Sequence, residues 1–170
     1  MQLLPINTPE LADQVAAWIA DRDTCPWLDF GNGVQTLSAV SLRIMAQKDV
    51  NVLRVFTADD DRPIGVVGLS SVNPAFKSAT LWTVLGDKSF AGRGYATRAV
   101  SRMLTLGFEE LGLHAINTWI VEHNPSIRVA ERVRFRPMGR QRQCHYIDGR
   151  PYDRFWFDLL ASEHTAIRDV

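Results

Sequence analysis

The stretch AGRGYA, from Ala91 to Ala96, has the residue types best suited to holding a ligand. A helical pattern begins directly after Gly94, so we expect a turn that leads into a helix N-terminus. The first N–H groups of a helix have no partner inside it, and the helix dipole adds positive charge there. Because glycine lets a phosphate approach such N–H groups closely, the stretch is a candidate phosphate seat. A tight turn that binds nothing is the alternative.

Two common phosphate motifs do not fit this stretch. A P-loop ends in Gly-Lys-Ser/Thr, and the sequence has no such tripeptide here. A dinucleotide fingerprint needs a third Gly or Ala where Thr97 stands, and an acidic residue near the end of the next strand, which carries Asn117. The residues therefore leave a pyrophosphate seat of another kind.

Hydrophobic periodicity predicts the elements that position this turn. Apolar residues at i, i+3 and i+4 predict a helix over 94–111 that Gly112 ends. Apolar runs at 80–85 and 115–121 predict strands on either side of it. A helix that crosses over between two such strands makes them parallel.

The remaining elements complete the order β-α-α-β-β-β-α-β-α-β-β. A helix begins at Thr8, a second is expected over 35–47, and a third over 124–133. On the second helix, we expect one buried face made of Leu37, Val40, Ile44 and Met45. The other expected strands are 2–6, 52–58, 64–72, 142–147 and 152–160. The predicted fold class is α/β: a mixed, mostly antiparallel sheet with a central parallel strand pair and helices on both faces.

Composition narrows the class of protein. With 170 residues, we expect one domain over 1–170. A formal net charge of zero argues against nucleic-acid binding. The first residues have no basic stretch followed by a long apolar one, and no apolar run is long enough to span a membrane, so we expect a cytoplasmic protein. We also expect a monomer or a homodimer. Cys25 and Cys144 match no metal-binding or redox spacing, so we expect free thiols and no metal, with one disulfide left open.

Three stretches resemble the GCN5-related N-acetyltransferase (GNAT) superfamily, most closely its branch of ribosomal-protein N-terminal acetyltransferases. GRGYATRAV (92–100) is similar to the motif Gln/Arg-x-x-Gly-x-Gly/Ala, with Ala91 in the first place. NPSIRVAERVRFRPMG (124–139) resembles the Asn-x-x-Ser helix of this family and the Gly-Phe after it. IDGRPYDRFWFDLL (147–160) resembles the closing hairpin. The resemblance covers nearly the whole chain.

This resemblance implies an acetyl-CoA-dependent N-acetyltransferase that uses direct attack in a ternary complex. The acceptor would be the primary amine of a peptide N-terminus, an amino sugar, an antibiotic or a small metabolite. Acetyl-CoA would lie where strands 80–85 and 115–121 splay apart. The implied cofactor-binding residues are Val84, Leu85, Gly92, Arg93, Gly94, Tyr95, Ala96, Thr97, Asn124 and Ser126. A non-catalytic acyl-CoA sensor and a transferase of longer acyl groups are the alternatives.

Three polar residues, Asn124, Ser126 and Arg93, each have a structural and a functional interpretation. By resemblance, Ser126 would protonate the leaving thiolate, whereas a serine at a helix start is also an ordinary cap. Asn124 would steady the cofactor or cap the same helix. Arg93 would contact a phosphate or remain a solvated loop residue.

The sequence departs from the family pattern where a general base is expected. The Asn-to-Ser spacing is one residue short, Arg134 replaces the glycine of Gly-Phe, and Ala130 stands where many relatives carry tyrosine. The strand SATLWTVLG has no acid. Glu122 and Tyr146 remain as weaker catalytic candidates, each with a structural alternative.

The acceptor pocket is expected from residues 21–35 and the closing hairpin. Trp27 and Phe30 are its candidate substrate-binding residues, and His145 is a weaker one. The acids Asp23 and Asp29 in the same loop would suit a cationic amine. Trp82 and Trp119 are interpreted as core aromatics of the sheet.

Overall fold

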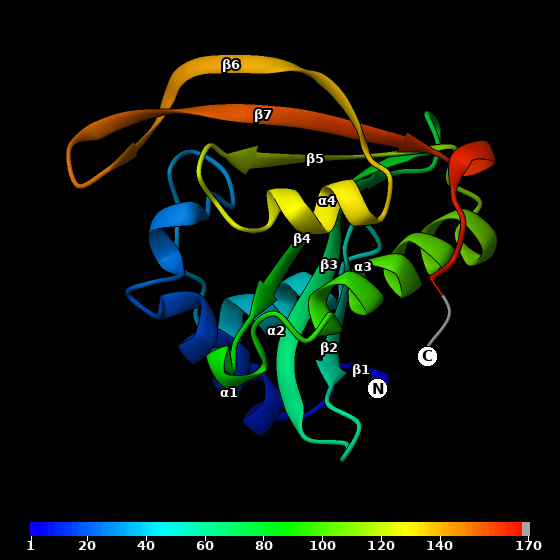
Figure 1. Cartoon of the computed structure of the whole chain (residues 1–170). Coiled ribbons are helices and arrows are strands. Elements are labelled where there is room, and N and C mark those ends of the chain that lie inside the picture. Colours follow the sequence, from blue (N-terminus) through cyan, green and yellow to red (C-terminus); the bar gives the residue numbers. More distant parts are fainter. Residues whose placement is uncertain (168–170) are drawn as a thin grey trace.

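The computed structural model describes residues 1–167, in which seven strands form one sheet with helices on both faces (Figure 1). The strands are β1 (Leu3–Pro5), β2 (Val52–Thr57), β3 (Pro63–Asn73), β4 (Ser78–Leu85), β5 (Ala115–Val121), β6 (Arg136–Ile147) and β7 (Arg150–Leu160). They lie in the order β1-β2-β3-β4-β5-β7-β6. Every neighbouring pair is antiparallel except β4 and β5, which are parallel. The predicted fold class and the parallel pair are therefore confirmed.

Four α-helices and several short helical turns connect these strands in the described part of the chain. The α-helices are α1 (Pro9–Ala20), α2 (Ala39–Ala46), α3 (Tyr95–Thr105) and α4 (Ile127–Arg132). Short 3-10 turns cover Cys25–Trp27, Lys88–Phe90 and Ala161–Glu163, and a π-helical turn over Leu106–Glu110 extends α3. Of the residues described, no helix is both long and apolar enough to cross a membrane.

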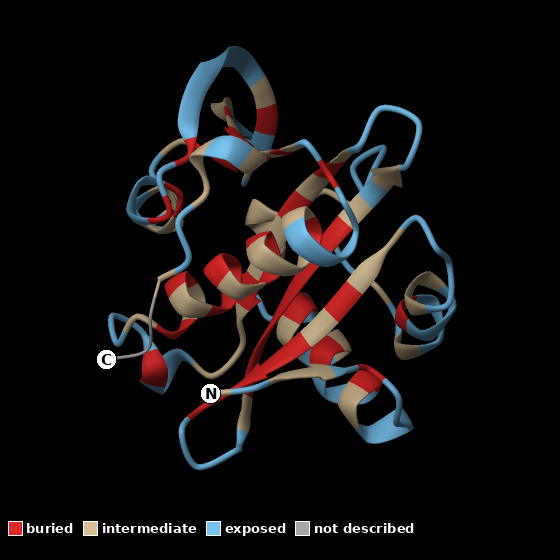
Figure 2. Ribbon diagram, turned by 90° about the vertical axis from the view of Figure 1, so that its right-hand side faces the viewer, coloured by how far each residue is buried: buried red, intermediate tan, exposed pale blue. Residues whose placement is uncertain are grey.

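Two apolar clusters lie on opposite faces of the sheet. On one face, α3 buries Ala99, Met103 and Leu104 against strand residues that include Leu69 and Ile116. On the other face, α1 and α2 pack against a second group, made of Ile6, Ala12, Val15, Ile19, Leu42, Leu53, Val55, Val66 and Val84. Figure 2 shows buried residues concentrated in the central strands and on the inner sides of the helices. Each fully buried aliphatic side chain contributes about 1.5–3 kcal/mol, so the two clusters fix the helices to the sheet.

Helix α2 differs from its prediction in length and in its buried face. It begins after Ser38, whose Oγ accepts the Ser41 N–H at 3.1 Å, rather than at residue 35. Leu42 is fully buried, whereas Val40 and Ile44 are 62% and 52% exposed. A position two residues away lies about 200° around a helix, so burial of Leu42 turns both of these side chains outward. The predicted face was therefore wrong at Val40 and Ile44.

Strand β6 is longer than the sequence indicated. It begins at Arg136, not at residue 142, and its register with β7 shifts twice. It forms the edge of the sheet, and its residues from 136 to 143 are all exposed. Because neither face of this segment is buried, it lacks the apolar alternation that marks a strand.

Candidate active site

The parallel strands β4 and β5 separate in the middle of the sheet. They pair only from Ser78 with Ala115 to Thr80 with Asn117. Beyond that point, the Thr118 hydroxyl donates to the Leu81 carbonyl at 2.9 Å. The predicted splay between these two strands is thus present.

The backbone of β4 presents a free edge along this gap. The carbonyls of Leu81 and Leu85 accept hydrogen bonds from side chains, Thr118 and Lys88 respectively, on the side away from β3. Backbone groups alternate in direction along a strand, so Thr83 also faces the gap. Thr83, Val84 and Leu85 all have register partners on β3, but by the same alternation the backbone groups of Val84 point toward β3, and its side chain is buried in the cluster under α1 and α2. This geometry favours Thr83 and Leu85 over Val84 as backbone partners for an extended ligand.

A cavity of about 420 Å³ occupies the gap and reaches both faces of the sheet. On the side of α3 and α4, its lining includes Val100, Thr118, Asn124, Ser126, Val129 and Ala130. We call this part the donor end. On the side of α1 and α2, its walls include Trp27, Asp29, Phe30, Trp82, Trp119 and Trp156. We call this part the aromatic end.

The turn before α3 has the geometry expected of a phosphate seat. Gly94 is the N-cap residue of α3 with φ 81°, and Gly92 has φ 77°. No side chain caps this helix start. Apart from its chain neighbours, a Cβ added at either glycine would meet no atom of the described residues within 4 Å, so no other part of the described chain covers these two glycines. The unpaired N–H groups of the first turn are therefore accessible to an anion.

Side chains around this turn hold it in place. Tyr95 is buried, and its hydroxyl donates to Asp59 at 2.6 Å, so only its backbone can serve a ligand. Ala96 is half-buried and Thr97 is buried in the same first turn. Arg93 is exposed, with its guanidinium 5.2 Å from the centre of the Phe90 ring.

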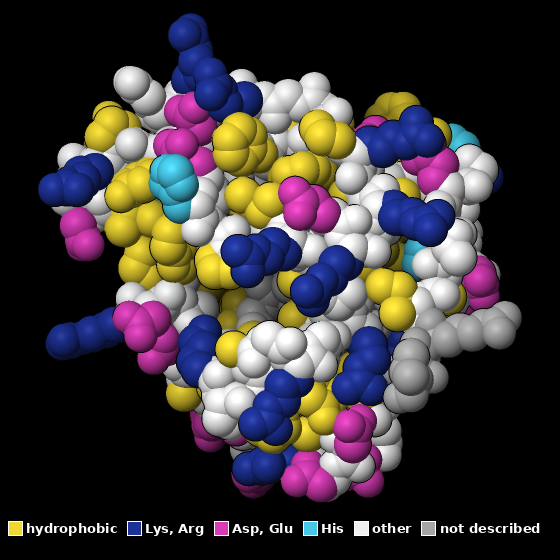
Figure 3. Space-filling model, viewed as in Figure 1, with side chains coloured by type: hydrophobic (Ala, Val, Ile, Leu, Met, Phe, Trp, Pro, Cys, Tyr) yellow, Lys and Arg dark blue, Asp and Glu magenta, His cyan; other side chains and the backbone are white. Residues whose placement is uncertain are grey.

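Basic side chains gather on the face of the molecule that carries α3 and α4, around a hollow near its centre (Figure 3). Exposed arginines of this region are Arg93 before α3, and Arg128 and Arg132 on α4. Although the chain has no net charge, these arginines place three positive charges beside α3 and α4, with Glu131 of α4 among them. Their net positive charge favours an approaching polyphosphate.

At the start of α4, capping belongs to Asn124 and not to Ser126. The Asn124 Oδ1 accepts the Ser126 N–H at 2.8 Å and the Ser126 Oγ–H at 2.7 Å. The Ser126 side chain makes no cap hydrogen bond of its own, and it lines the cavity. His123, which precedes the shortened Asn-to-Ser spacing, and Arg134, which replaces the glycine of Gly-Phe, both have positive φ, of 68° and 67°.

Two of the weaker candidates lie apart from Ser126. The Glu122 Oε1 accepts the Asp153 N–H at 2.8 Å, so this carboxylate ties β5 to β7. Tyr146 is 63% exposed near the end of the closing hairpin. Neither residue is part of the cavity lining. The structure thus brings Trp27 and Phe30 to the same cavity as Ser126, but not Glu122 or Tyr146.

Three tryptophans of the sheet form walls that the sequence did not predict. Trp82 of β4, Trp119 of β5 and Trp156 of β7 all line the aromatic end and are half-buried. Trp119 and Trp156 are paired across the two strands, and Phe30 packs edge-on to Trp82 at 5.2 Å. Trp82 packs against the apolar cluster under α1 and α2, in agreement with its interpretation as a core aromatic, but the separation of β4 from β5 also leaves Trp82 and Trp119 facing a cavity.

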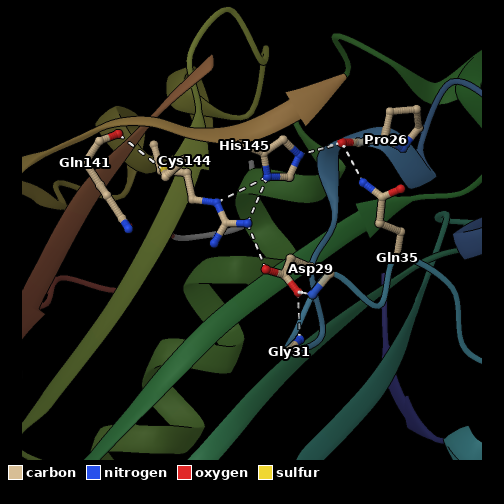
Figure 4. Close-up of polar contacts among 9 residues, drawn as sticks. Pro26, Asp29, Gly31, Gln35, Gln141, Cys144 and His145 are labelled. Carbon is tan, nitrogen blue, oxygen red and sulfur yellow. Dashed lines mark hydrogen bonds and ion pairs between the residues drawn. The ribbon is translucent and has the colours of Figure 1, made fainter. Parts of the chain in front are cut away.

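Arg154 of β7 connects the closing hairpin to residues 21–35 after α1, which we call the acceptor loop. Its Nη2 donates to Asp29 Oδ2 at 2.8 Å, and it also donates to His145 Nδ1 at 2.9 Å. Since His145 Nδ1 is an acceptor, Nε2 carries the proton and donates to the Pro26 carbonyl at 2.6 Å (Figure 4). The Arg154 guanidinium also lies 4.0 Å from the centre of the Trp119 ring.

These contacts change the roles predicted for His145 and Asp29. His145 is 4% exposed and outside the cavity lining, so it supports the loop rather than facing a substrate. Burial of Asp29 disfavours its ionisation. The hydrogen bond from Arg154, the N–H groups of Gly31 and Gly33, and the Arg154 charge outweigh that cost and lower the Asp29 pKa. The carboxylate is thus ionised and already neutralised.

Comparisons with known proteins agree with this architecture. Residues 1–136 match the family model described as an acetyltransferase (GNAT) domain. The uncharacterized N-acetyltransferase p20 of Bacillus licheniformis is 27% identical over 134 residues, covering 78% of this chain and 72% of that protein. The probable N-acetyltransferase YjcK of Bacillus subtilis (strain 168) is 37% identical over 97 residues, 56% of this chain and 53% of YjcK.

Solved structures show the same fold. A mutant of the spermidine N-acetyltransferase SpeG from Vibrio cholerae matches with a TM-score of 0.78 and 20% sequence identity. The match covers 95% of this chain and 94% of the SpeG chain. At this identity, the likeness concerns the arrangement of strands and helices.

Proposed function

Because residues 1–136 match its family model, the chain belongs to the GNAT acetyltransferase family and is an N-acetyltransferase, and we propose that it moves the acetyl group of acetyl-CoA to a primary amine held in the aromatic end. The observation that supports this proposal best is one continuous cavity, which joins Ser126 at the donor end to Trp27 and Phe30 at the aromatic end. Donor and acceptor would meet in the gap between β4 and β5.

The donor end has the groups that acetyl-CoA requires. The N–H groups from Gly94 to Thr97 would hold the pyrophosphate at the start of α3, whereas the Arg93 N–H already donates to the Phe90 carbonyl at 3.3 Å. The free edge of β4 at Thr83 and Leu85 would pair with the pantetheine arm, as an added strand does. Bound acetyl-CoA supplies the thioester carbon that the amine attacks.

The proposed transfer forms one C–N bond and breaks one C–S bond. The neutral amine attacks the acetyl carbon, and N–H groups of the β4 edge near Leu85 stabilise the oxyanion. The thiolate then leaves, and the Ser126 hydroxyl, turned from Asn124 toward the sulfur, donates its proton. The attacking nitrogen loses one N–H proton to water as the amide forms, and water returns a proton to Ser126, so the reaction releases CoA and the acetylated amine.

Water is also the proposed acceptor of the amine proton. Among the cavity-lining residues described, the single carboxylate is Asp29, and Arg154 holds it at 2.8 Å. A carboxylate in this state is a poor base because its pKa is lowered. The acceptor must therefore lose its proton to solvent before attack.

A pair of glycine substitutions tests the cofactor seat. Gly94→Leu and Gly112→Leu each place a side chain at positive φ where no protein atom lies within 4 Å, one at each end of the helix that begins with α3. Both should lose about 1–2 kcal/mol of stability from backbone strain. Only Gly94→Leu should raise the Kd for acetyl-CoA in calorimetry, by at least about tenfold, because its side chain fills the seat. Equal affinities for the two variants would contradict the proposal.

A further inference from the structure

The aromatic end presents a large uncovered apolar surface. Trp82, Trp119 and Trp156 lie on one face of adjacent strands, and all three side chains are half-buried. Trp27 and Phe30 face them from the loop after α1. Aromatic rings placed in this way stack on planar or bulky apolar groups, and this contact favours binding most when water is excluded.

Charge in the aromatic end is balanced within the protein. Asp29 is the charged residue among the cavity-lining residues that the structure describes. Its two oxygens accept from Arg154, Gly31 and Gly33. Arg154 in turn donates hydrogen bonds to Asp29 and His145, and its guanidinium lies over the Trp119 ring. A ligand with a second positive charge would lose its hydration here and find no free counterion.

The loop that carries Trp27 and Phe30 is held at three points. Lys88 Nζ donates to Thr24 Oγ1 at 2.9 Å, next to the end of β4. The Pro26 carbonyl accepts from His145 and from Gln35 Nε2 (Figure 4). Asp29 is held by Arg154 as described above. A wall fixed in this way is pre-organised, so it selects its ligand by shape and polarity.

We propose that the acceptor is a primary monoamine on an aromatic or bulky apolar body, with no second charge on the part that enters the cavity. This inference rests on the proposed function and specifies its acceptor. The cavity of about 420 Å³ must hold the thioester end of the donor as well. The aromatic end therefore admits a small amine, or the terminal part of a larger one.

An acceptor panel tests the proposal with the intact chain. Thiol release at saturating acetyl-CoA would be measured with 2-phenylethylamine, ethylamine and spermidine, each at several concentrations. We expect kcat/KM for 2-phenylethylamine to exceed both others by at least about thirtyfold, since a buried ring is worth more than one methylene. Calorimetry with CoA present gives the same comparison for binding alone.

Two substitutions separate the contributions of the walls and of the charge. Trp156→Leu should lower kcat/KM for 2-phenylethylamine by a factor at least about ten times larger than the factor for ethylamine. Arg154→Gln frees the Asp29 charge. The kcat/KM for spermidine, divided by that for 2-phenylethylamine, should therefore rise by at least about tenfold. Arg140→Gln is the matched control, because Arg140 pairs with Asp153 on the same hairpin and is 56% exposed.

The outcomes distinguish the acceptor class from the proposed function. If 2-phenylethylamine binds best but no amine is acetylated, the acceptor class holds and the proposed transfer fails. If kcat/KM for spermidine or ethylamine equals that for 2-phenylethylamine, the acceptor class is overturned while the transfer stands. If no amine binds in the presence of CoA, the acceptor class is overturned.

Discussion

Replacing Arg154 by methionine should weaken both the fold and the acceptor loop. Methionine keeps much of the apolar stem but removes the hydrogen bonds to Asp29 and His145. A hydrogen bond to a charged group contributes about 1.5–3 kcal/mol, and the contact with the Trp119 ring about 0.5–1 kcal/mol. Asp29 keeps the N–H groups of Gly31 and Gly33, which offset part of the loss. We therefore expect the free energy of unfolding to fall by about 2–3 kcal/mol.

Urea unfolding followed by circular dichroism measures this change near neutral pH. A double-mutant cycle with Asp29→Asn isolates the pair, and we expect a coupling of about 1–2 kcal/mol because both side chains are at least four-fifths buried, 14% and 18% exposed. Arg140→Met is the control. Its pair with Asp153 lies at the surface and should cost less than about 1 kcal/mol. A loss below about 0.5 kcal/mol in Arg154→Met would refute the reasoning.

The pH dependence of the same comparison follows from the Asp29 pKa. That pKa lies below its usual 3.8, because the Arg154 and glycine hydrogen bonds outweigh the desolvation that raises it. Stability from the ion pair is therefore fully present above the unfolded pKa and is lost as pH falls through the folded one. Wild type and Asp29→Asn should differ by a constant amount at higher pH and converge below about pH 4. A difference that persists unchanged in strong acid would also refute the assignment.

Three further predictions concern catalysis and backbone strain. Ser126→Ala should lower kcat by more than about tenfold in thiol-release assays, and wild-type rates would remove Ser126 from the mechanism. Arg134→Gly should raise the free energy of unfolding by about 0.5–1 kcal/mol because Arg134 has φ 67°, whereas Arg132→Gly inside α4 should lower it. The apparent pKa of kcat/KM should follow the pKa of each amine tested, and a fixed value across amines would indicate a protein base.

The order of elements was predictable because buried faces leave periodic apolar patterns. The helix after Gly94 and its flanking strands were recognised in this way, and the gap between β4 and β5 followed from the resemblance. The edge strand β6 was partly missed because its first half buries nothing. Helix α2 has one fully buried residue, Leu42, so its apolar pattern did not identify the inward face.

The acceptor side depended on contacts that no local pattern contains. Arg154 meets Asp29 across 125 positions of sequence, and its importance appears only when the loop and hairpin are in place. Trp119 and Trp156 become neighbours through the register of β5 and β7. Gly94, by contrast, was recognised because the start of a helix fixes its surroundings within a few residues, and Ser126 was a candidate through the resemblance.

The cavity through the sheet divides the molecule into two parts that can vary separately. The donor end depends on β4, α3 and α4, whereas the walls of the aromatic end include the loop after α1 and the outer strands. Changes to that loop can alter the amine without disturbing the thioester. In the proposed reaction, the two products would therefore occupy opposite ends of the cavity.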